Sequence, residues 1–274
     1  MKQVFRYGCA SALLILFSYS CSTVPITGRK QMNLLPEPTL IEMGLTSYSE
    51  FIGKNKLSSN RIQSDLLQAA GKRISAAVNQ FLVANNMQDR LSEFQWEFKL
   101  VADTTPNAWC MPGGKVVFYE GILPYTRDEN GIAVVMGHEI AHAVARHGNE
   151  RMSQSLVTEL GGLALAKALE SKPEQTRQLF ALAYGYGSQL GVLLPYSRLH
   201  EREADRLGLI FMALAGYDPK HALVFWERML EANKGFRIPE WLSTHPLDES
   251  RIADLKEYLP EALRYYESLI PPKN

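Results

Sequence analysis

The sequence predicts an α+β fold that is mostly helical, with one small antiparallel sheet ahead of a central helix. Residues 62–81 repeat apolar side chains at the spacing of a single helix face, as an amphipathic helix does. Residues 94–102 instead alternate apolar and polar side chains, which is typical of a strand. With 274 residues and 46% hydrophobic content, the chain can bury the core of one large domain or two small ones. Its formal net charge of zero gives no support for a nucleic-acid partner.

The first twenty residues have the pattern of an export signal. Lys2 and Arg6 form a basic start, an apolar run covers residues 9–17, and small residues lead to Cys21. The apolar run is short for a membrane span, so a signal peptide of the lipoprotein type is expected over residues 1–20. Cys21 would then carry the lipid. Ordinary cleavage nearby, or an uncleaved anchor, is the alternative.

A tether and one folded domain are expected after the signal. Residues 21–38 are polar and contain proline, so they are expected to connect the lipid to the domain over residues 39–274. Cys110 would be the lone cysteine of that domain, because Cys9 leaves with the signal and Cys21 is acylated. We therefore expect Cys110 to be a small core residue without a disulfide partner.

The first half of the domain is expected to hold two helices and a small sheet. Residues 107–114 would present an edge strand to which an extended peptide could add through backbone hydrogen bonds. An ordinary hairpin with a buried tryptophan is the alternative for that segment. The helices are predicted over residues 38–53 and 62–85, and the strands over residues 94–102, 107–111 and 115–119.

The central helix contains the most informative stretch, GHEIAHAVARHGNER at residues 137–151. His138 and His142 are four residues apart, so on a helix they lie on one face and can bind one metal ion. Glu139 lies on a neighbouring part of that face and can reach a water at the metal. Imidazole nitrogen suits Zn²⁺ better than Ca²⁺ or Mg²⁺, so the pattern predicts the helix of a zinc hydrolase. A helix whose two histidines only pack or cap is the alternative.

A third metal ligand is expected in YSRLHEREADRLG at residues 196–208. A catalytic zinc usually has three protein ligands, with the fourth position open to water. Glu201 is the candidate ligand, and Asp205 lies one helical turn later. Asp205 would accept a hydrogen bond from a ligating histidine and so fix its tautomer. The alternative is that these acidic residues form a solvated helix face.

The remaining helices and one loop follow, with a further candidate residue. Residues 241–246, WLSTHP, are expected to form a loop that contains His245. His245 could donate to the developing oxyanion, occupy the open zinc position in a resting state, or simply fasten the loop. Tyr196 is a second candidate for the oxyanion, whereas His147, His200 and His221 are expected to be structural. Helices are predicted over residues 152–171, 173–194, 217–234 and 248–258.

These motifs together resemble the M48 family of zinc metallopeptidases. The resemblance rests on HEIAHAVARHGNER, SRLHEREADRLG and STHPLDESRI, and it runs from about Cys21 to Ile252. The segments CSTVPITGRKQMNLL and NAWCMPGGKVVFYEGIL are similar to those of the BepA-like and LoiP-like bacterial lipoproteins of that family.

The resemblance implies a gluzincin-like fold with a small antiparallel sheet before the metal-binding helix. Matched position by position, it makes His138, His142 and Glu201 the zinc ligands and Glu139 the catalytic acid and base. Asp205 would support a ligand, and His245 would lie beside the metal as a second catalytic residue. These assignments agree with the reading of the residues themselves.

The resemblance also implies a zinc-dependent endopeptidase of the bacterial cell envelope. Its substrates would be misfolded or misassembled envelope proteins, bound in extended conformation. A lipid on Cys21 would hold the protein at the periplasmic face of the outer membrane. The alternative is a zinc-containing periplasmic chaperone that binds outer-membrane proteins and cleaves them little.

Overall fold

The computed structural model describes residues 21–160, 173–184, 198–233, 241–242, 245 and 249–269. The predicted export signal at residues 1–20 lies outside this part of the chain, as do Tyr196 and much of the predicted helices over residues 152–171 and 173–194. No helix in the described ranges is both long and apolar enough to cross a membrane.

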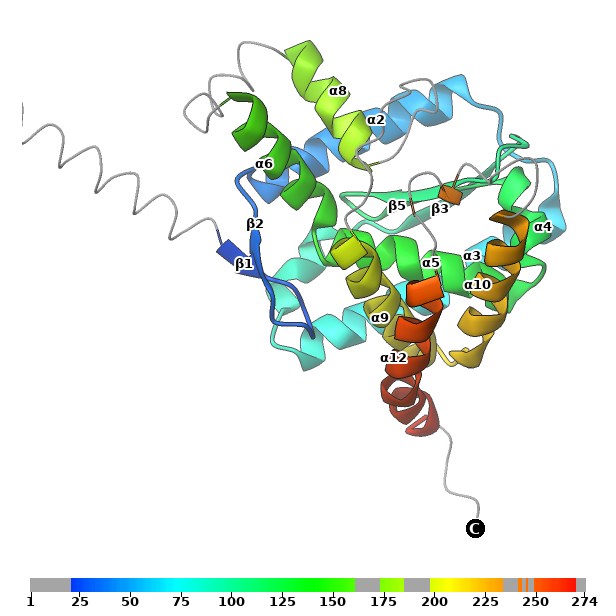
Figure 1. Cartoon of the computed structure of the whole chain (residues 1–274). Helices are drawn as coiled ribbons and strands as arrows, with labels where there is room; N and C mark the ends of the chain where they lie inside the picture. The colour runs from blue at the N-terminus through cyan, green and yellow to red at the C-terminus, as the bar shows by residue number, and fades with distance from the viewer. Residues whose placement is uncertain are drawn as a thin grey trace, which may run out of the picture.

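Helices surround a small sheet, and their arrangement can be followed in Figure 1. The strands are β1 (Cys21–Thr23), β2 (Lys30–Met32), β3 (Glu97–Val101), β4 (Ala108–Met111) and β5 (Lys115–Tyr119). The α-helices are α2 (Glu37–Lys54), α3 (Arg61–Ala84), α4 (Leu123–Thr126), α5 (Glu129–Val144), α6 (His147–Leu160), α8 (Pro173–Tyr184), α9 (Arg198–Leu214), α10 (Lys220–Asn233) and α12 (Glu249–Glu267). Two short 3₁₀ helices are η1 (Gln88–Glu93) and η2 (Glu120–Ile122). The predicted α+β class with a mostly helical, gluzincin-like fold is confirmed.

The three-stranded sheet has the order β3-β5-β4 and is mixed. β4 and β5 form the predicted antiparallel hairpin, with Met111 opposite Lys115. β3 runs parallel to β5, with Glu97 also opposite Lys115 on the other side. After β3 the chain crosses to the far side of β5, so the hairpin inserts β5 between the two edge strands. The sequence predicted an antiparallel sheet. That prediction holds for β4 and β5 but not for β3, which is parallel to β5.

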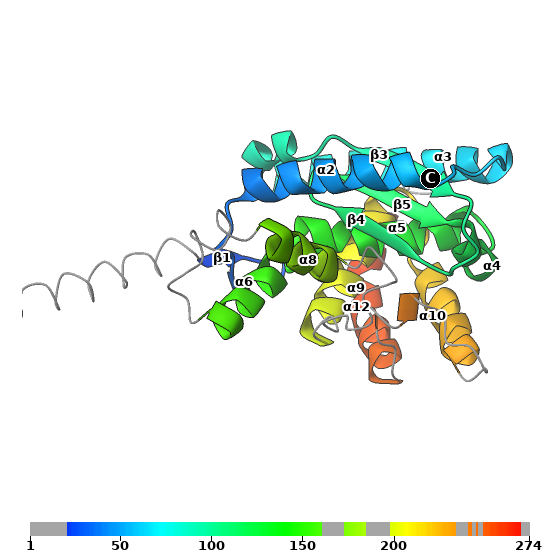
Figure 2. The same ribbon diagram turned by 90° about the horizontal axis from the view of Figure 1, so that it is seen from above.

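The strands β4 and β5 are buried on both faces, because their side chains alternate between two hydrophobic cores. Val116 and Phe118 pack into the core that contains α3, α5 and α9. Val117 and Tyr119 point the opposite way, into a core formed with α2 and α6. Figure 2 shows α2 running alongside the sheet on one side. This packing fixes the edge strand β4 beside the helix α5.

The helices α5 and α9 approach one another more closely than side chains would permit. Gly137 of α5 faces Gly208 of α9, and a Cβ added to Gly137 would lie 2.9 Å from the Gly208 carbonyl oxygen. A Cβ added to Gly208 would lie 3.0 Å from the backbone nitrogen of His138. The two backbones therefore meet directly, and the polar side chains that follow Gly137 on α5 face those that precede Gly208 on α9.

The N-terminal residues form a hairpin that packs against the domain. β1 and β2 pair antiparallel, with Cys21 opposite Met32. Val24 and Leu35 are buried, one in each hydrophobic core. The segment predicted as a tether is thus in contact with the folded domain, and the predicted division after residue 38 stays a prediction.

Candidate metal centre

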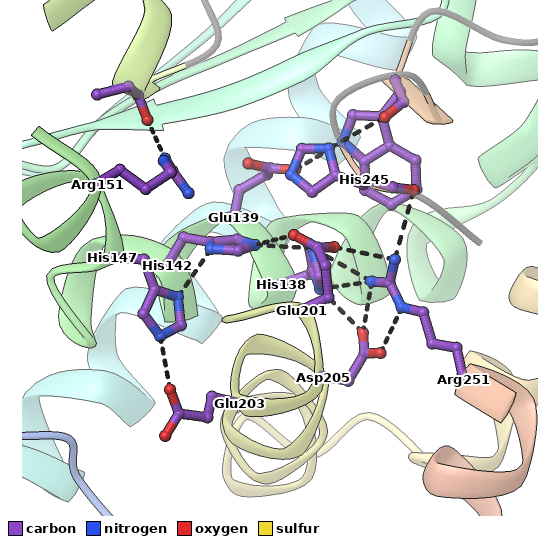
Figure 3. Close-up of polar contacts among 12 residues, drawn as sticks. His138, Glu139, His142, His147, Arg151, Glu201, Glu203, Asp205, His245 and Arg251 are labelled. Atoms are coloured by element: carbon purple, nitrogen blue, oxygen red, sulfur yellow. Dashed lines mark hydrogen bonds and ion pairs between the residues drawn. The ribbon is translucent and has the colours of Figure 1, made fainter. Parts of the chain in front are cut away.

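Four side chains bring a ligand atom each to one buried point between α5, α9 and the segment before α12. His138 and His142 come from α5, Glu201 from the first turn of α9, and His245 from the loop. Their ligand atoms all lie within 4.8 Å of one another, and all four side chains are buried. Figure 3 shows the histidines of α5 and Glu201 turned toward one another. The candidate ligands read from the sequence are thus brought together.

The distances between these donors fit a small tetrahedral ion. The Nε2 atoms of His138 and His142 are 3.1 Å apart. The Glu201 carboxylate lies 3.4 Å from the His138 Nε2 through one oxygen and 3.3 Å from the His142 Nε2 through the other. Donors bonded to one ion at the zinc distances of 2.0 to 2.2 Å in tetrahedral geometry would be about 3.3 to 3.6 Å apart. Three protein donors therefore already have nearly the spacing that one zinc-sized ion requires.

The charge around the donors also favours a divalent cation. Glu139, Glu201 and Asp205 are all buried here, and the guanidinium of Arg251 is their buried cationic partner among the described residues. With neutral imidazoles, as a bound metal requires, and with all three carboxylates ionised, one guanidinium leaves a formal excess of two negative charges. Buried charge of one sign is costly unless it is paired, so a cation with two positive charges suits this cluster.

His138 is held by a carboxylate. Its Nδ1 lies 3.0 Å from Asp205 Oδ1, so Nδ1 carries a hydrogen, and Nε2 faces the other donors, where it would give its lone pair to a metal that displaces its proton. Arg251 in turn donates to Asp205 from Nε at 2.6 Å and approaches Glu201 from Nη1 at 2.9 Å. Burial lowers the pKa of His138, but its hydrogen bonds to Asp205 and Glu201 outweigh burial and raise the pKa to about 9.

His142 is held by a second imidazole. Its Nδ1 lies 2.9 Å from the Nδ1 of His147, and the Nε2 of His147 lies 3.2 Å from Glu203 Oε2. Figure 3 shows this chain of contacts running away from the donors. Burial lowers the pKa of both imidazoles well below its usual value, so both are neutral near pH 7. The interpretation of His147 as structural is therefore incomplete, since it contacts a candidate ligand directly.

Glu139 lies beside the donors and not among them. The indole Nε1 of Trp241 donates to its Oε1 at 2.7 Å, and the Nε2 of His245 is 3.5 Å from the same oxygen. Burial raises the pKa of Glu139 to about 7, although the charge of His138 and the bond from Trp241 lower it. A carboxylate with a pKa near 7 is suited to accept and return a proton at neutral pH.

His245 presents a lone pair to the site. Its Nδ1 lies 3.1 Å from the carbonyl oxygen of Trp241, which accepts only, so Nδ1 carries the hydrogen of the neutral ring. Burial lowers the pKa of His245 to about 3, so the ring stays neutral. The Nε2 atom then acts as an acceptor or a metal donor. Of the three expected roles, this arrangement favours the metal donor over an oxyanion donor.

Two residues of the site were not found from the sequence. Arg251 packs its guanidinium 3.9 Å from the ring centre of Trp226 while it binds Asp205. Arg251 follows His245 by six residues in STHPLDESRI, so the motif contained it without showing its partner. Trp241 lies in the same segment, and the predicted loop over residues 241–246 is wrong at Trp241 and Leu242, which are helical. The indole of Trp241 reaches Glu139 because the ring stacks on His245, with centres 4.9 Å apart.

The structure also shows where Cys110, His200 and His221 lie. Cys110 is a buried free thiol on β4, as expected. Burial, followed by the nearby charge of Glu139, raises its pKa well above the usual value, so it stays a thiol. His221 is exposed at the start of α10. His200 is buried and lies 2.8 Å from Glu150, stacked on His147.

The edge strand β4 lies next to this site. β4 is the last strand in the order β3-β5-β4, so its outer side pairs with no described strand. The helix α5, which carries Glu139, packs against β4. The backbone nitrogen of Trp241 also donates to the Pro106 carbonyl oxygen just before β4, at 2.9 Å. An extended peptide on this edge would therefore pass near Glu139.

The comparison with protein families agrees with this geometry. Residues 68–259 match the family described as peptidase family M48. The chain belongs to this family. M48 peptidases depend on a metal, and the donor cluster on α5 and α9 is a candidate metal site of the HExxH type.

Curated relatives support the same class. The chain is 34% identical over 244 residues to the mitochondrial metalloendopeptidase OMA1 of Schizosaccharomyces pombe, covering 87% of this chain and 66% of that protein. It is 36% identical over 203 residues to OMA1 of Saccharomyces cerevisiae, covering 72% and 55%. It is 27% identical over 248 residues to the beta-barrel assembly-enhancing protease of Escherichia coli, covering 88% and 48%. The chain thus spans about half to two thirds of the length of these relatives.

These relatives correct part of the functional expectation. The metallopeptidase class stands, but the bacterial cell-envelope setting is contradicted, because the relatives at 34% and 36% identity are mitochondrial proteins and the bacterial one is less similar. The predicted periplasmic and outer-membrane location, and the periplasmic chaperone offered as the alternative, are withdrawn with it. The comparisons likewise give no support to a lipid on Cys21. The pattern of residues 1–21 had favoured the bacterial setting.

Proposed function

We propose that this protein is a zinc-dependent endopeptidase that hydrolyses peptide bonds of polypeptides bound in extended conformation. His138, His142 and Glu201 would hold the zinc ion, with His245 as a fourth donor in the resting protein. The observation that carries the proposal is the set of distances of 3.1 to 3.4 Å among the first three donors, with Glu139 beside them. A purely structural site has no use for that extra carboxylate.

Glu139 would move the protons of the reaction. Zinc, when bound, supplies a Lewis acid that makes a water molecule acidic enough to ionise near neutral pH. Glu139 accepts a proton from the attacking water and delivers it to the nitrogen of the leaving amine. The indole of Trp241, bound to Oε1 at 2.7 Å, leaves the other oxygen of Glu139 for this transfer. Asp205 and Arg251 keep His138 in the tautomer that a ligand needs.

The substrate would lie along β4. A peptide on the outer edge of this strand would form backbone hydrogen bonds. These bonds require an extended peptide but do not depend on its side chains. We expect that methylation of alternate backbone amides in a cleaved peptide weakens its binding, since those amides face the strand. Methylation of the intervening amides, which face away, should leave the Michaelis constant unchanged and provides the control.

Replacement of the carboxylate tests the proposed chemistry. Glu139→Gln should keep one zinc ion per chain and lower cleavage of an unfolded protein by about 100-fold or more, since a general base contributes about 10²- to 10⁴-fold. Zinc content by mass spectrometry and fragment yield on gels measure the two effects. Glu129→Gln, on the same helix but paired with Arg73, should retain full activity. An active Glu139→Gln protein would refute the assignment.

A further inference from the structure

Arg29, in the N-terminal hairpin, joins two buried carboxylates of the domain. Its Nη1 and Nη2 donate to the two oxygens of Glu150 on α6 at 2.8 and 2.7 Å. Its Nε and Nη2 donate to Glu203 on α9 at 3.0 and 2.8 Å. The side chains of Glu150 and Glu203 are only 5% and 4% exposed. One guanidinium therefore holds together the hairpin, α6 and α9.

Glu203 connects Arg29 to His147, which in turn contacts the candidate metal ligand His142. The Nε2 of His147 lies 3.2 Å from Glu203, and a carboxylate only accepts, so this nitrogen carries the hydrogen. The Nδ1 of the neutral His147 ring is then an acceptor, and His142 must donate to it from its own Nδ1. The Nε2 of His142 is thereby left with the lone pair that a metal requires. The position of the Glu203 carboxylate thus sets the tautomer of a candidate ligand through one intervening ring.

The turn between β1 and β2 places the side chains of Thr27 and Arg29 beside Glu203. The backbone nitrogen of Val24 donates to the Arg29 carbonyl oxygen at 2.9 Å, which closes the turn. Ile26 and Gly28 take positive φ angles of 66° inside it. The Thr27 hydroxyl, at the centre of the turn, donates to Glu203 at 2.7 Å. Two side chains of one tight turn, those of Thr27 and Arg29, therefore bind the same buried carboxylate.

Electrostatics make Arg29 more than a packing residue. Glu203 accepts hydrogen bonds from Thr27 at 2.7 Å and from the Arg29 Nε and Nη2 at 3.0 and 2.8 Å. Hydrogen bonds from Arg29 and His200 outweigh burial and lower the pKa of Glu150 to about 2. Without the guanidinium, two ionised carboxylates would face each other in a buried site, which is unfavourable. Glu203 would then move away from His147.

We infer that Arg29 is a positioning residue for the metal site: docking of the N-terminal hairpin orients the ligand His142 through Glu203 and His147. This inference rests on the proposed function, because it concerns the ligand set named there. The hairpin is thus a part of the catalytic domain and not only a connection to it. Arg29 lies before residues 68–259, the part of the chain that matches the family.

Zinc affinity in graded variants tests this inference. In Arg29→Ala, removal of the guanidinium should weaken zinc binding about tenfold, the lower end of the range for groups that orient a ligand. Arg29→Lys keeps the charge but loses the two-sided hydrogen bonding, so it should fall between the wild type and Arg29→Ala. Thr27→Val removes one hydrogen bond and should weaken binding least. Competition with a chromogenic chelator measures each dissociation constant, and the visible spectrum of the cobalt-substituted protein reports the ligand geometry.

Arg206→Ala is the matched control. Arg206 also binds one carboxylate at two points, donating from Nε and Nη2 to Glu261 at 2.7 and 3.1 Å. That pair joins α9 to α12 and does not touch a metal donor. Its loss should leave the zinc affinity and the cobalt spectrum as in the wild type. An equal loss of affinity in Arg206→Ala and Arg29→Ala would overturn the inference, because it would indicate a general loss of stability.

The outcomes separate the inference from the proposed function. Wild-type protein that binds no zinc overturns both. Wild-type protein that binds zinc, with Arg29→Ala binding within twofold of it and with the same cobalt spectrum, overturns only the role of Arg29. If Arg29→Ala does not fold, Arg29→Lys and Thr27→Val decide the matter. Wild-type affinity in both overturns the inference, whereas a graded loss supports it.

Discussion

The two histidines of α5 have the same candidate task but are held in different ways. His138 contacts a carboxylate directly, Asp205, which Arg251 then binds from α12. His142 contacts a neutral imidazole, His147, and reaches a carboxylate only one step later. The first support comes from the C-terminal half of the chain and the second ends in the N-terminal hairpin. The site is therefore held from both ends of the sequence.

The difference teaches how each ligand is tuned. The direct carboxylates leave His138 in a strongly negative environment, and its pKa is raised to about 9 although burial lowers it. Burial dominates at His142, and its pKa is lowered well below the usual value. The supports have the same geometrical task, since each fixes a hydrogen on Nδ1. They differ in how much negative charge they bring to the ligand, so we expect unequal effects when each is removed.

The largest effect is expected on the His138 side. Asp205→Ala should destabilise the metal-free protein by about 3–5 kcal/mol, because it leaves Arg251 buried with one carboxylate partner fewer. It should also weaken zinc binding by about 10- to 100-fold, through loss of the hydrogen bond that orients His138. Urea unfolding and chelator competition measure the two changes.

A partly exposed ion pair between the same two helices is the control for Asp205. Asp254 of α12 binds Arg202 of α9 at 2.7 Å, but the Arg202 side chain is 51% exposed. Exposed ion pairs contribute at most about 1 kcal/mol, so Asp254→Ala should change stability little and zinc binding not at all. Equal effects of the two alanine variants would remove the distinction drawn for the His138 side.

A smaller effect is expected on the His142 side. His147→Leu should weaken zinc binding about tenfold, since His142 loses a neutral acceptor and not a charged one. His147→Asn should recover part of the loss, because the asparagine oxygen can occupy the place of the ring Nδ1. The same chelator competition decides the result. A loss in His147→Leu that exceeds the loss in Asp205→Ala would reverse the comparison.

The smallest effect is expected from pH, and it concerns the N-terminal support. Glu150 and Glu203 have folded pKa values of about 2 against a reference of 4.5. Between these values the unfolded chain binds more protons, so the stability from Arg29 is complete above pH 4.5 and decreases as the pH falls toward 2. Urea midpoints measured in this range with a chelator present should decrease more steeply for the wild type than for Glu150→Gln. Equal slopes would show that this cluster does not contribute.

Periodicity and spacing predicted the parts of the site that lie on one helix turn. His138 and His142 were found because four residues bring side chains to one face of a helix, and Glu201 with Asp205 for the same reason. His147 was missed because its phase was judged on a continuous helix. The helix α5 ends at Val144, and Arg146 takes a positive φ of 56°. The chain therefore turns there, which directs His147 back onto His142.

Contacts between distant segments were beyond the reach of the pattern. The position of β3 was predicted from alternation and that of β5 from residues that favour strands, but their parallel pairing depends on the route of the chain between them. Arg29 and Glu203 are 174 residues apart, so no local spacing joins them. The polar composition of residues 21–38 suggested a tether, although the polar groups include those that bind buried carboxylates. A sequence shows that a side chain is charged, but it does not show which residue pairs with that charge in the folded protein.

The direct meeting of Gly137 and Gly208 has a consequence for the choice of ion. Because backbone atoms of α5 and α9 are already in contact, the separation of the ligand-bearing turns is set by main chain and cannot contract. It can widen only if the helices part, which would open the core around them. Calcium takes six to eight oxygen donors, and this site instead holds two imidazoles of α5 at a fixed distance from one carboxylate of α9. Two residues without side chains thus keep the ligand-bearing turns at a separation that suits a small ion with few donors.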